Sequence, residues 1–137
     1  MRSKALQLQS TAMQPDVQVH IVDDDPALRR AIGFLVRSFG LREAGYASAE
    51  DFLARLEDTP PGCLVLDLNM PGGMNGVELQ RELKRRGLEI PTIVVTALQD
   101  DPLIKRAREF GAMAVLTKPF DDGVLLSWIE RALSICG

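Results

Sequence analysis

The chain has 137 residues, 46% hydrophobic and 26% charged, so it can bury one core and most simply forms one domain. A net charge of −3 and a pI of about 5.2 leave no basic footprint for direct nucleic-acid binding. No stretch reaches the roughly 20 apolar residues that a membrane span needs, so we expect no membrane contact.

The cysteines and the N-terminal segment indicate a reducing, cytoplasmic location. Cys63 and Cys136 are far apart and form neither a metal-spaced nor a redox pair. Both have apolar neighbours and are predicted to be small core residues. Residues 1–17 lack a continuous apolar run, which argues against a signal peptide. We expect a flexible extension there, with Met13 as an alternative start, and a single domain over residues 18–137.

Short apolar runs then alternate with segments of helical period. The first strand is predicted over residues 18–23. A helix follows over residues 25–40, with Asp25 as N-cap, Pro26 at its first position and Gly40 as its stop. Spacing of 3.6 residues predicts that its buried face consists of Leu28, Ile32, Leu35, Val36 and Phe39.

The second strand, over residues 41–47, is polar and is therefore predicted to lie near a sheet edge. The next helix, over residues 48–58, starts with the capping-box pattern of Ser48 and Asp51. The later strands are predicted at residues 63–68, 91–97 and 112–117, and the later helices at residues 77–86, 100–111 and 121–136. The last helix is predicted to bury Val124, Leu125, Trp128, Ile129, Ala132 and Leu133.

Five strands that alternate with five helices predict βαβ units and an α/β fold, with helices on both faces of a parallel sheet. The first, third, fourth and fifth strands are almost continuously apolar, as expected of parallel strands buried on both sides. Ligands of such sheets bind beyond the carboxyl ends of the strands.

Polar residues collect at those strand ends. They are Asp23, Asp24 and Asp25 after the first strand, Asp67 and Asn69 after the third, Thr96 at the fourth, and Thr117 and Lys118 at the fifth. Clustered carboxylates raise one another's proton affinity unless a cation is present, and Mg²⁺ is held by one or two carboxylates with water. A metal, a lysine and a hydroxyl suit a phosphoryl group, which an aspartate can attack.

The sequence resembles the receiver domain of bacterial two-component response regulators in four segments: VHIVDDDPALRR, CLVLDLNMPGGMNGVEL, PTIVVTA and AVLTKPF. The resemblance covers about residues 19–133 and implies the flavodoxin-like (βα)5 three-layer fold with strand order 2-1-3-4-5. The segments YASAEDFLARL and GVELQREL look closest to receivers attached to helix-turn-helix transcription factors.

The resemblance also implies a role for each polar residue. Asp67 would be the phosphoacceptor, Thr96 the switch hydroxyl and Lys118 the cation that contacts the phosphoryl group. The Mg²⁺ ligands would be Asp23, directly or through water, Asp24, Asp67 and the backbone carbonyl of Asn69.

By the same resemblance, the chain would be a switch that takes phosphate from a sensor histidine kinase and catalyses only its own phosphorylation and dephosphorylation. Phosphorylation would be read on the fourth helix, fifth strand and fifth helix, which could also pair two copies. The chain would be either a stand-alone receiver that acts through protein partners or part of a longer regulator that controls transcription through a helix-turn-helix output domain outside this chain.

Two positions depart from the family pattern. Val115 stands where receivers usually carry Tyr or Phe, three residues before the lysine of the fifth strand, so no rotating ring can report activation. The turn after Asp67 has one extra glycine, Gly72 or Gly73, which could loosen the loop and alter docking or phosphate lifetime.

Other interpretations remain beside this one. A haloacid-dehalogenase-like phosphatase would use Asp23 as nucleophile, but Ala27 replaces its expected Thr or Val. A flavodoxin would need a phosphate-cradling loop where the three aspartates stand. A receiver-fold interaction module without phosphorylation is a further alternative. Asp25 fits a helix cap better than a metal ligand, and His20 is predicted to be a packed core imidazole.

Overall fold

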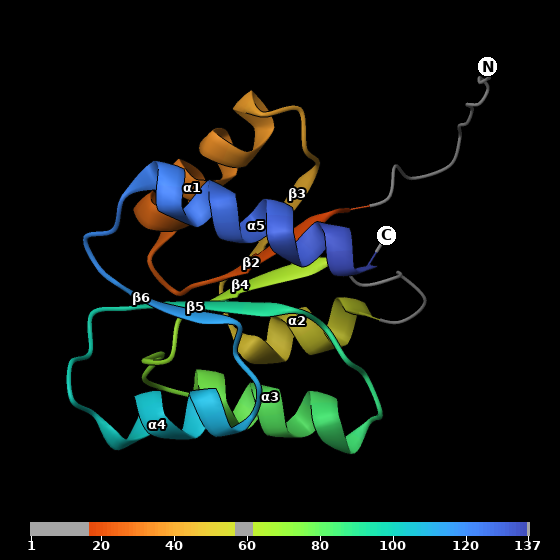
Figure 1. Ribbon diagram of the computed structural model, residues 1–137. Helices are drawn as coiled ribbons and strands as arrows, with labels where there is room; N and C mark the ends of the chain where they lie inside the picture. The colour runs from red at the N-terminus through yellow and green to blue at the C-terminus, as the bar shows by residue number, and fades with distance from the viewer. Residues whose placement is uncertain (1–16, 57–61, 137) are drawn as a thin grey trace.

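The computed structural model describes residues 17–56 and 62–136 and contains a sheet of five parallel strands with connecting helices (Figure 1). The strands are β2 (Val19–Val22), β3 (Glu43–Tyr46), β4 (Cys63–Leu66), β5 (Thr92–Thr96) and β6 (Ala114–Thr117). The helices are α1 (Pro26–Ser38), α2 (Ala49–Leu56), α3 (Gly76–Arg85), α4 (Pro102–Glu109) and α5 (Asp122–Cys136).

The strand order is β3-β2-β4-β5-β6, which confirms the predicted order 2-1-3-4-5. The polar strand β3 lies at an edge, as expected. Val22 pairs with Leu66, and Thr96 pairs with Thr117, in register. The carboxyl ends of β2, β4, β5 and β6 therefore reach the same edge of the sheet.

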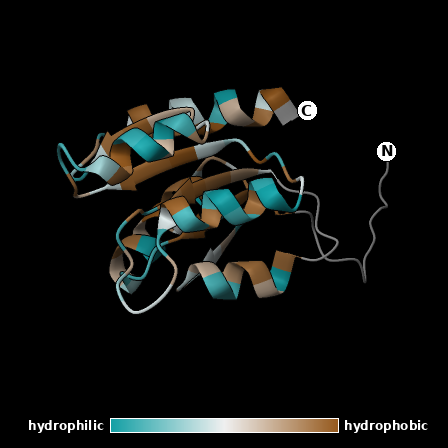
Figure 2. Ribbon diagram, turned by 90° about the horizontal axis from the view of Figure 1, so that it is seen from below, coloured by the Kyte–Doolittle hydropathy of each residue, from teal (hydrophilic) through white to brown (hydrophobic). Residues whose placement is uncertain are grey.

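Helices cover both faces of the sheet and make three layers. Helices α1 and α5 lie on one face, and α2, α3 and α4 lie on the other (Figure 1). Alternate strand residues supply the two cores: Val65 packs with α1 and α5, whereas Leu64 and Leu66 pack with α2 and α3. Figure 2 shows hydrophobic residues along the strands and hydrophilic residues on the outer sides of the helices. This is the burial that a parallel sheet requires.

The three central strands, β2, β4 and β5, are buried along their whole length. The prediction of equal burial for the last strand was wrong, because β6 is only half buried and ends in an exposed Thr117. The reason is its position as the second edge of the sheet, with a neighbouring strand on one side only.

Side-chain caps explain where several helices begin. Asp25 caps α1 and accepts the N–H groups of Ala27 and Leu28, as predicted. Ser48 accepts the Asp51 N–H at 3.0 Å. A complete capping box at α3, formed by Asn75 and Glu78, was not predicted from the sequence.

Three details of the predicted helix burial were wrong. Phe39 is 58% exposed, because it is the C-cap of α1, where the backbone leaves the helical conformation and the 3.6-residue spacing ends. Val124 is 44% exposed, whereas the unpredicted Leu126 is buried. In α5 the residues facing the sheet are Leu125, Ile129 and Ala132, and Val124 lies beside this stripe.

Several predictions fall outside the described residues. The expected flexible extension lies there except for Val17, and so do Met13 and the last two residues of the helix predicted over 48–58. Cys63 is buried, as predicted, but the side chain of Cys136 is not among those described. In the two described ranges, no helix combines the length and apolar character needed to cross a bilayer.

Candidate phosphoryl-transfer and metal site

Three carboxylates meet at the carboxyl end of the sheet. One oxygen from each of Asp23, Asp24 and Asp67 lies within 4.8 Å of the other two. Asp23 is 1% exposed and Asp67 is 5% exposed, whereas Asp24 faces solvent. The structure thus brings together three of the residues that the sequence predicted to share this edge.

The sheet itself places the two buried carboxylates. The Asp23 N–H donates to the Tyr46 carbonyl at 3.2 Å, and the Asp67 N–H donates to the Val22 carbonyl at 3.0 Å. These bonds continue the parallel ladder by one residue beyond β2 and β4. Both aspartate backbones are therefore held in strand geometry while their side chains project from the strand ends.

Lys118 is the cation of the site. Its Nζ lies 3.1 Å from Asp23 Oδ2 and 3.4 Å from Asp67 Oδ2, so one ammonium contacts both buried carboxylates. Lys118 follows β6, on the far side of β5 from Asp67. Its long stem allows the ammonium to reach across the tip of β5.

Asp23 has two further polar contacts through α1 and its cap. The Asp25 N–H donates to Asp23 Oδ1 at 2.9 Å, and Arg29 Nη1 donates to the Asp23 carbonyl at 2.6 Å. Arg29 was not predicted, because nothing in its helical spacing shows that its guanidinium turns back to the strand end. The bond ties α1 to the backbone of the acidic site.

The start of α3 packs directly on the backbone of Asp67. The Gly76 N–H donates to the Leu68 carbonyl at 3.0 Å, and a Cβ at Gly76 would lie only 2.6 Å from the Asp67 carbonyl oxygen. Only glycine permits this approach. The Asn69 N–H also donates to Asp67 Oδ1 at 3.3 Å, which orients the carboxylate.

Thr96 is fully buried at the tip of β5, and its hydroxyl oxygen accepts the Leu98 N–H at 3.2 Å. It joins the site through the backbone, because the Lys118 N–H donates to the Thr96 carbonyl at 2.8 Å. Val115, at the position of the usual aromatic ring, is half buried against the cluster that contains Ala107 of α4.

The surroundings of Asp67 act on its pKa in opposite directions. Burial and the neighbouring charge of Asp23 raise the pKa of Asp67, and Lys118 and the Asn69 N–H only partly offset them. Burial lowers the pKa of Lys118, but its hydrogen bond to Asp23 and the charges of Asp67 and Asp23 outweigh this, so the Lys118 pKa is raised. The lysine therefore stays charged at neutral pH.

This donor set fits a divalent cation. Three carboxylates lie beside a single ammonium, so negative groups outnumber the positive one. The pKa of Asp67 is raised by burial first and then by the charge of Asp23. Carboxylate oxygens are preferred by hard divalent cations. Asp23, Asp24 and Asp67 are the residues that could hold one.

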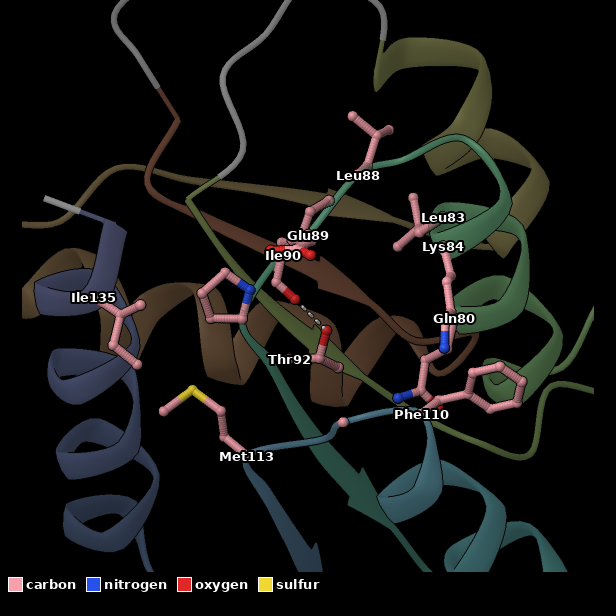
Figure 3. A pocket seen from close by; sticks show the side chains of 12 residues that line it. Gln80, Leu83, Lys84, Leu88, Glu89, Ile90, Thr92, Phe110, Met113 and Ile135 are labelled. Atoms are coloured by element: carbon pink, nitrogen blue, oxygen red, sulfur yellow. Dashed lines mark hydrogen bonds between the residues drawn. The ribbon is translucent and has the colours of Figure 1, made fainter.

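A hollow of about 440 Å³ lies at the opposite end of the sheet, near the start of β5 (Figure 3). Its lining includes Gln80, Phe110, Met113 and Ile135, and none of the predicted site residues. Gln80 Nε2 donates to the Ala107 carbonyl at 3.1 Å, which joins α3 to α4. The hollow is therefore separate from the acidic site.

Comparison with known proteins identifies the family to which this fold and acidic site belong. The sequence profile of the response regulator receiver domain matches residues 19–130. The chain belongs to the response regulator receiver family. Receivers are the phosphorylation-activated switches of two-component systems, and the haloacid-dehalogenase and flavodoxin interpretations are set aside by this membership.

The receiver is similar to proteins named as a transcriptional regulatory protein and as a response regulator. It is 43% identical to the transcriptional regulatory protein FixJ of Rhizobium meliloti over 117 residues, which cover 85% of this chain and 57% of FixJ. It is 40% identical to the response regulator protein TodT of Pseudomonas putida over 117 residues, or 85% of this chain and 51% of TodT. The chain thus spans little more than half the length of these curated relatives.

Solved structures share the fold. One titled as the crystal structure of FixJ-N has a TM-score of 0.79 and 41% identity, and the match covers 88% of this receiver and 96% of that chain. The response regulator StyR has a TM-score of 0.81 and 39% identity, with coverage of 88% and 61%.

Proposed function

We propose that this receiver accepts a phosphoryl group on Asp67 from a phosphohistidine of a sensor histidine kinase. The observation that carries the proposal is the meeting of Asp67 with Lys118 and two further carboxylates at the carboxyl end of the sheet. A carboxylate so placed can act as a nucleophile beside a fixed positive charge. A pure interaction module would gain nothing from burying these charges.

In the proposed step, a carboxylate oxygen of Asp67 attacks phosphorus. The new O–P bond forms as the N–P bond to the donor imidazole breaks, and that nitrogen keeps the electron pair. The donor ring carries a proton on its other nitrogen, so it leaves as a neutral imidazole. Lys118 stabilises charge on the phosphoryl oxygens, and Thr96 supplies a hydroxyl donor beside them. Hydrolysis of the acyl phosphate by water returns the Asp67 carboxylate and inorganic phosphate. These are the only reactions we propose the chain to catalyse.

The metal in this proposal is Mg²⁺. The residues that would hold it are Asp24, Asp67, Asn69 through its backbone carbonyl, and Asp23 directly or through water. When bound, Mg²⁺ supplies positive charge that offsets the charge of the phosphoryl group. The oxygen-rich donor set and the surplus negative charge support this assignment. The chain's own contribution is to hold these oxygens at the ends of rigid strands.

Phosphorylation would be read on α4, β6 and α5. Thr96 and Lys118 lie at the ends of β5 and β6, so a group of −1.5 to −2 charges at Asp67 can displace both. We propose that this surface pairs two phosphorylated copies, and that regulation of transcription passes through a helix-turn-helix output domain outside this chain. The relatives named as transcriptional regulators support a cytoplasmic location.

The first test is intact mass after incubation with acetyl phosphate and Mg²⁺, with Asp67→Asn and a metal-free sample as controls. We expect a gain of one phosphoryl group that requires both Asp67 and Mg²⁺, and a shift toward dimer in size-exclusion chromatography of the product. A phosphoryl group that survives Asp67→Asn would place the acceptor elsewhere. No gain, with Mg²⁺ binding shown by calorimetry, would reject small-molecule phosphorylation, and no gain without Mg²⁺ binding would favour the interaction module.

A further inference from the structure

The loop between Asp67 and α3 carries the extra glycine, and it is fixed at both of its ends. Near Asp67, the Asn69 N–H is bonded to the carboxylate itself. At α3, the capping box of Asn75 and Glu78 and the close approach of Gly76 hold the helix start. The question is what holds the middle of the loop, residues 70–74.

A carboxylate from another helix contacts this middle part. Glu50, in the first turn of α2, accepts the Met74 N–H on Oε2 at 2.8 Å. This hydrogen bond holds the pKa of Glu50 below its ordinary range. Met74 is also partly buried against the core between α2, α3 and the sheet. The loop is thus tied to α2 by a charged hydrogen bond beside a hydrophobic contact.

Gly73 provides the space for that carboxylate. A Cβ at Gly73 would lie 2.9 Å from Glu50 Oε2 and 3.2 Å from Oε1, so any side chain would push the carboxylate away. Gly72 differs, because it has a φ of 96° and meets no atom within 4 Å. Of the two glycines, Gly72 turns the chain and Gly73 makes room for Glu50.

We propose that Glu50 is a positioning residue for phosphoryl transfer, because it holds the glycine loop and, with it, the Asn69 backbone beside Asp67. The inference rests on the proposed function of Asp67. It replaces the expectation that the extra glycine loosens the loop. The longer loop is held by a bond that Gly73 makes sterically possible.

The test compares five variants with the wild-type chain. Glu50→Ala removes the acceptor, and Gly73→Ala fills its space while the backbone at that position tolerates alanine, because its φ is not left-handed. The double variant shows whether both changes act through one contact. Glu50→Gln keeps an oxygen acceptor without charge. Glu89→Ala, which removes an exposed carboxylate before β5 at the opposite end of the sheet, is the matched control.

Three measurements are made on each variant. Exchange of the Met74 amide, followed by NMR without Mg²⁺, reports the contact itself. The initial rate of phosphorylation by acetyl phosphate reports its effect on the site. Thermal melting of every variant checks that the fold is intact.

We expect Glu50→Ala and Gly73→Ala each to speed Met74 exchange and slow phosphorylation by about five-fold, the effect of one hydrogen bond. The double variant should be no slower than either single variant. Glu50→Gln should lie closer to wild type, and Glu89→Ala should match it.

Wild-type phosphorylation rates in both single variants would overturn the inference, and so would losses that multiply in the double variant. Slower phosphorylation with unchanged Met74 exchange would overturn it as well. If the wild-type chain itself takes no phosphoryl group while Met74 exchange still depends on Glu50, the failure lies in the proposed function, and the positioning role falls with it.

Discussion

The acidic end of the sheet and the aromatic cluster around His20 both bury titratable groups, but they treat charge in opposite ways. At the acidic end, two buried carboxylates each lie within ion-pair distance of one lysine. In the cluster, His20 packs against Tyr46 and Phe52, and burial lowers the pKa of His20. A buried imidazole with a lowered pKa packs as a neutral ring, whereas clustered carboxylates with a lysine can bind a charged ligand.

The two regions also differ in how completely their polar atoms are satisfied. His20 Nδ1 lies 3.0 Å from the Tyr46 hydroxyl oxygen, while Nε2 has no partner among the described residues. Asp23, by contrast, has hydrogen bonds to both carboxylate oxygens and to its carbonyl. The polar atoms of Asp23 are therefore more completely hydrogen-bonded than those of His20. Removing one partner of Asp23 should cost more stability than removing the partner of His20.

The largest effect should come from Lys118→Met, which leaves Asp23 and Asp67 buried without their cation. Removing one partner of a buried ion pair is strongly destabilising, and with Lys118 partly exposed we expect a loss of about 2 kcal/mol in the free energy of unfolding. Urea denaturation at pH 7.5 without divalent cations measures it. Stability equal to wild type would show that solvent already screens these carboxylates.

A smaller effect should appear in how the free energy of unfolding depends on pH through His20. The folded-state pKa of His20 lies below its ordinary value of 6.5, so below pH 6.5 the unfolded chain takes up a proton that the native imidazole resists. Stability should fall as the pH falls through this window, by at most about 1.4 kcal/mol per pH unit. His20→Asn should flatten this part of the profile between pH 7.5 and 5.5. An unchanged slope would assign the pH dependence to other groups.

The smallest effect on stability should come from Asp24→Asn, because Asp24 is exposed. Without Mg²⁺, we expect its free energy of unfolding to stay within about 0.5 kcal/mol of wild type. Added Mg²⁺ should raise the melting temperature of wild type, by linkage, more than that of the variant. Equal shifts in both proteins would remove Asp24 from the metal ligands.

The fold could be predicted because it depends on local periodicity. Apolar runs bounded by Gly and Pro predicted the strands, and the shared direction of parallel strands predicted that Asp23, Asp67 and Lys118 would meet. Burial was predicted wrongly in places such as Phe39 and β6. Phe39 lies where the helical periodicity ends, and β6 is an edge strand whose exposure depends on having a neighbour on one side only.

The supporting contacts of the site could not be read from the sequence in the same way. Arg29 reaches the Asp23 carbonyl, and Glu50 reaches the Met74 N–H, through side-chain directions that depend on how helices pack. Asn75 is the exception, because the pattern of Asn followed three residues later by Glu is a recognisable capping signal.

The hydrogen bond from the Lys118 N–H to the Thr96 carbonyl makes these two residues the last rung of the ladder between β5 and β6. Because this bond joins the ends of the two strands, a displacement of the Lys118 backbone would also displace the end of β5 at Thr96. In a receiver whose Val115 has no ring to turn, we expect this bond to be one route by which phosphorylation displaces the ends of β5 and β6 together.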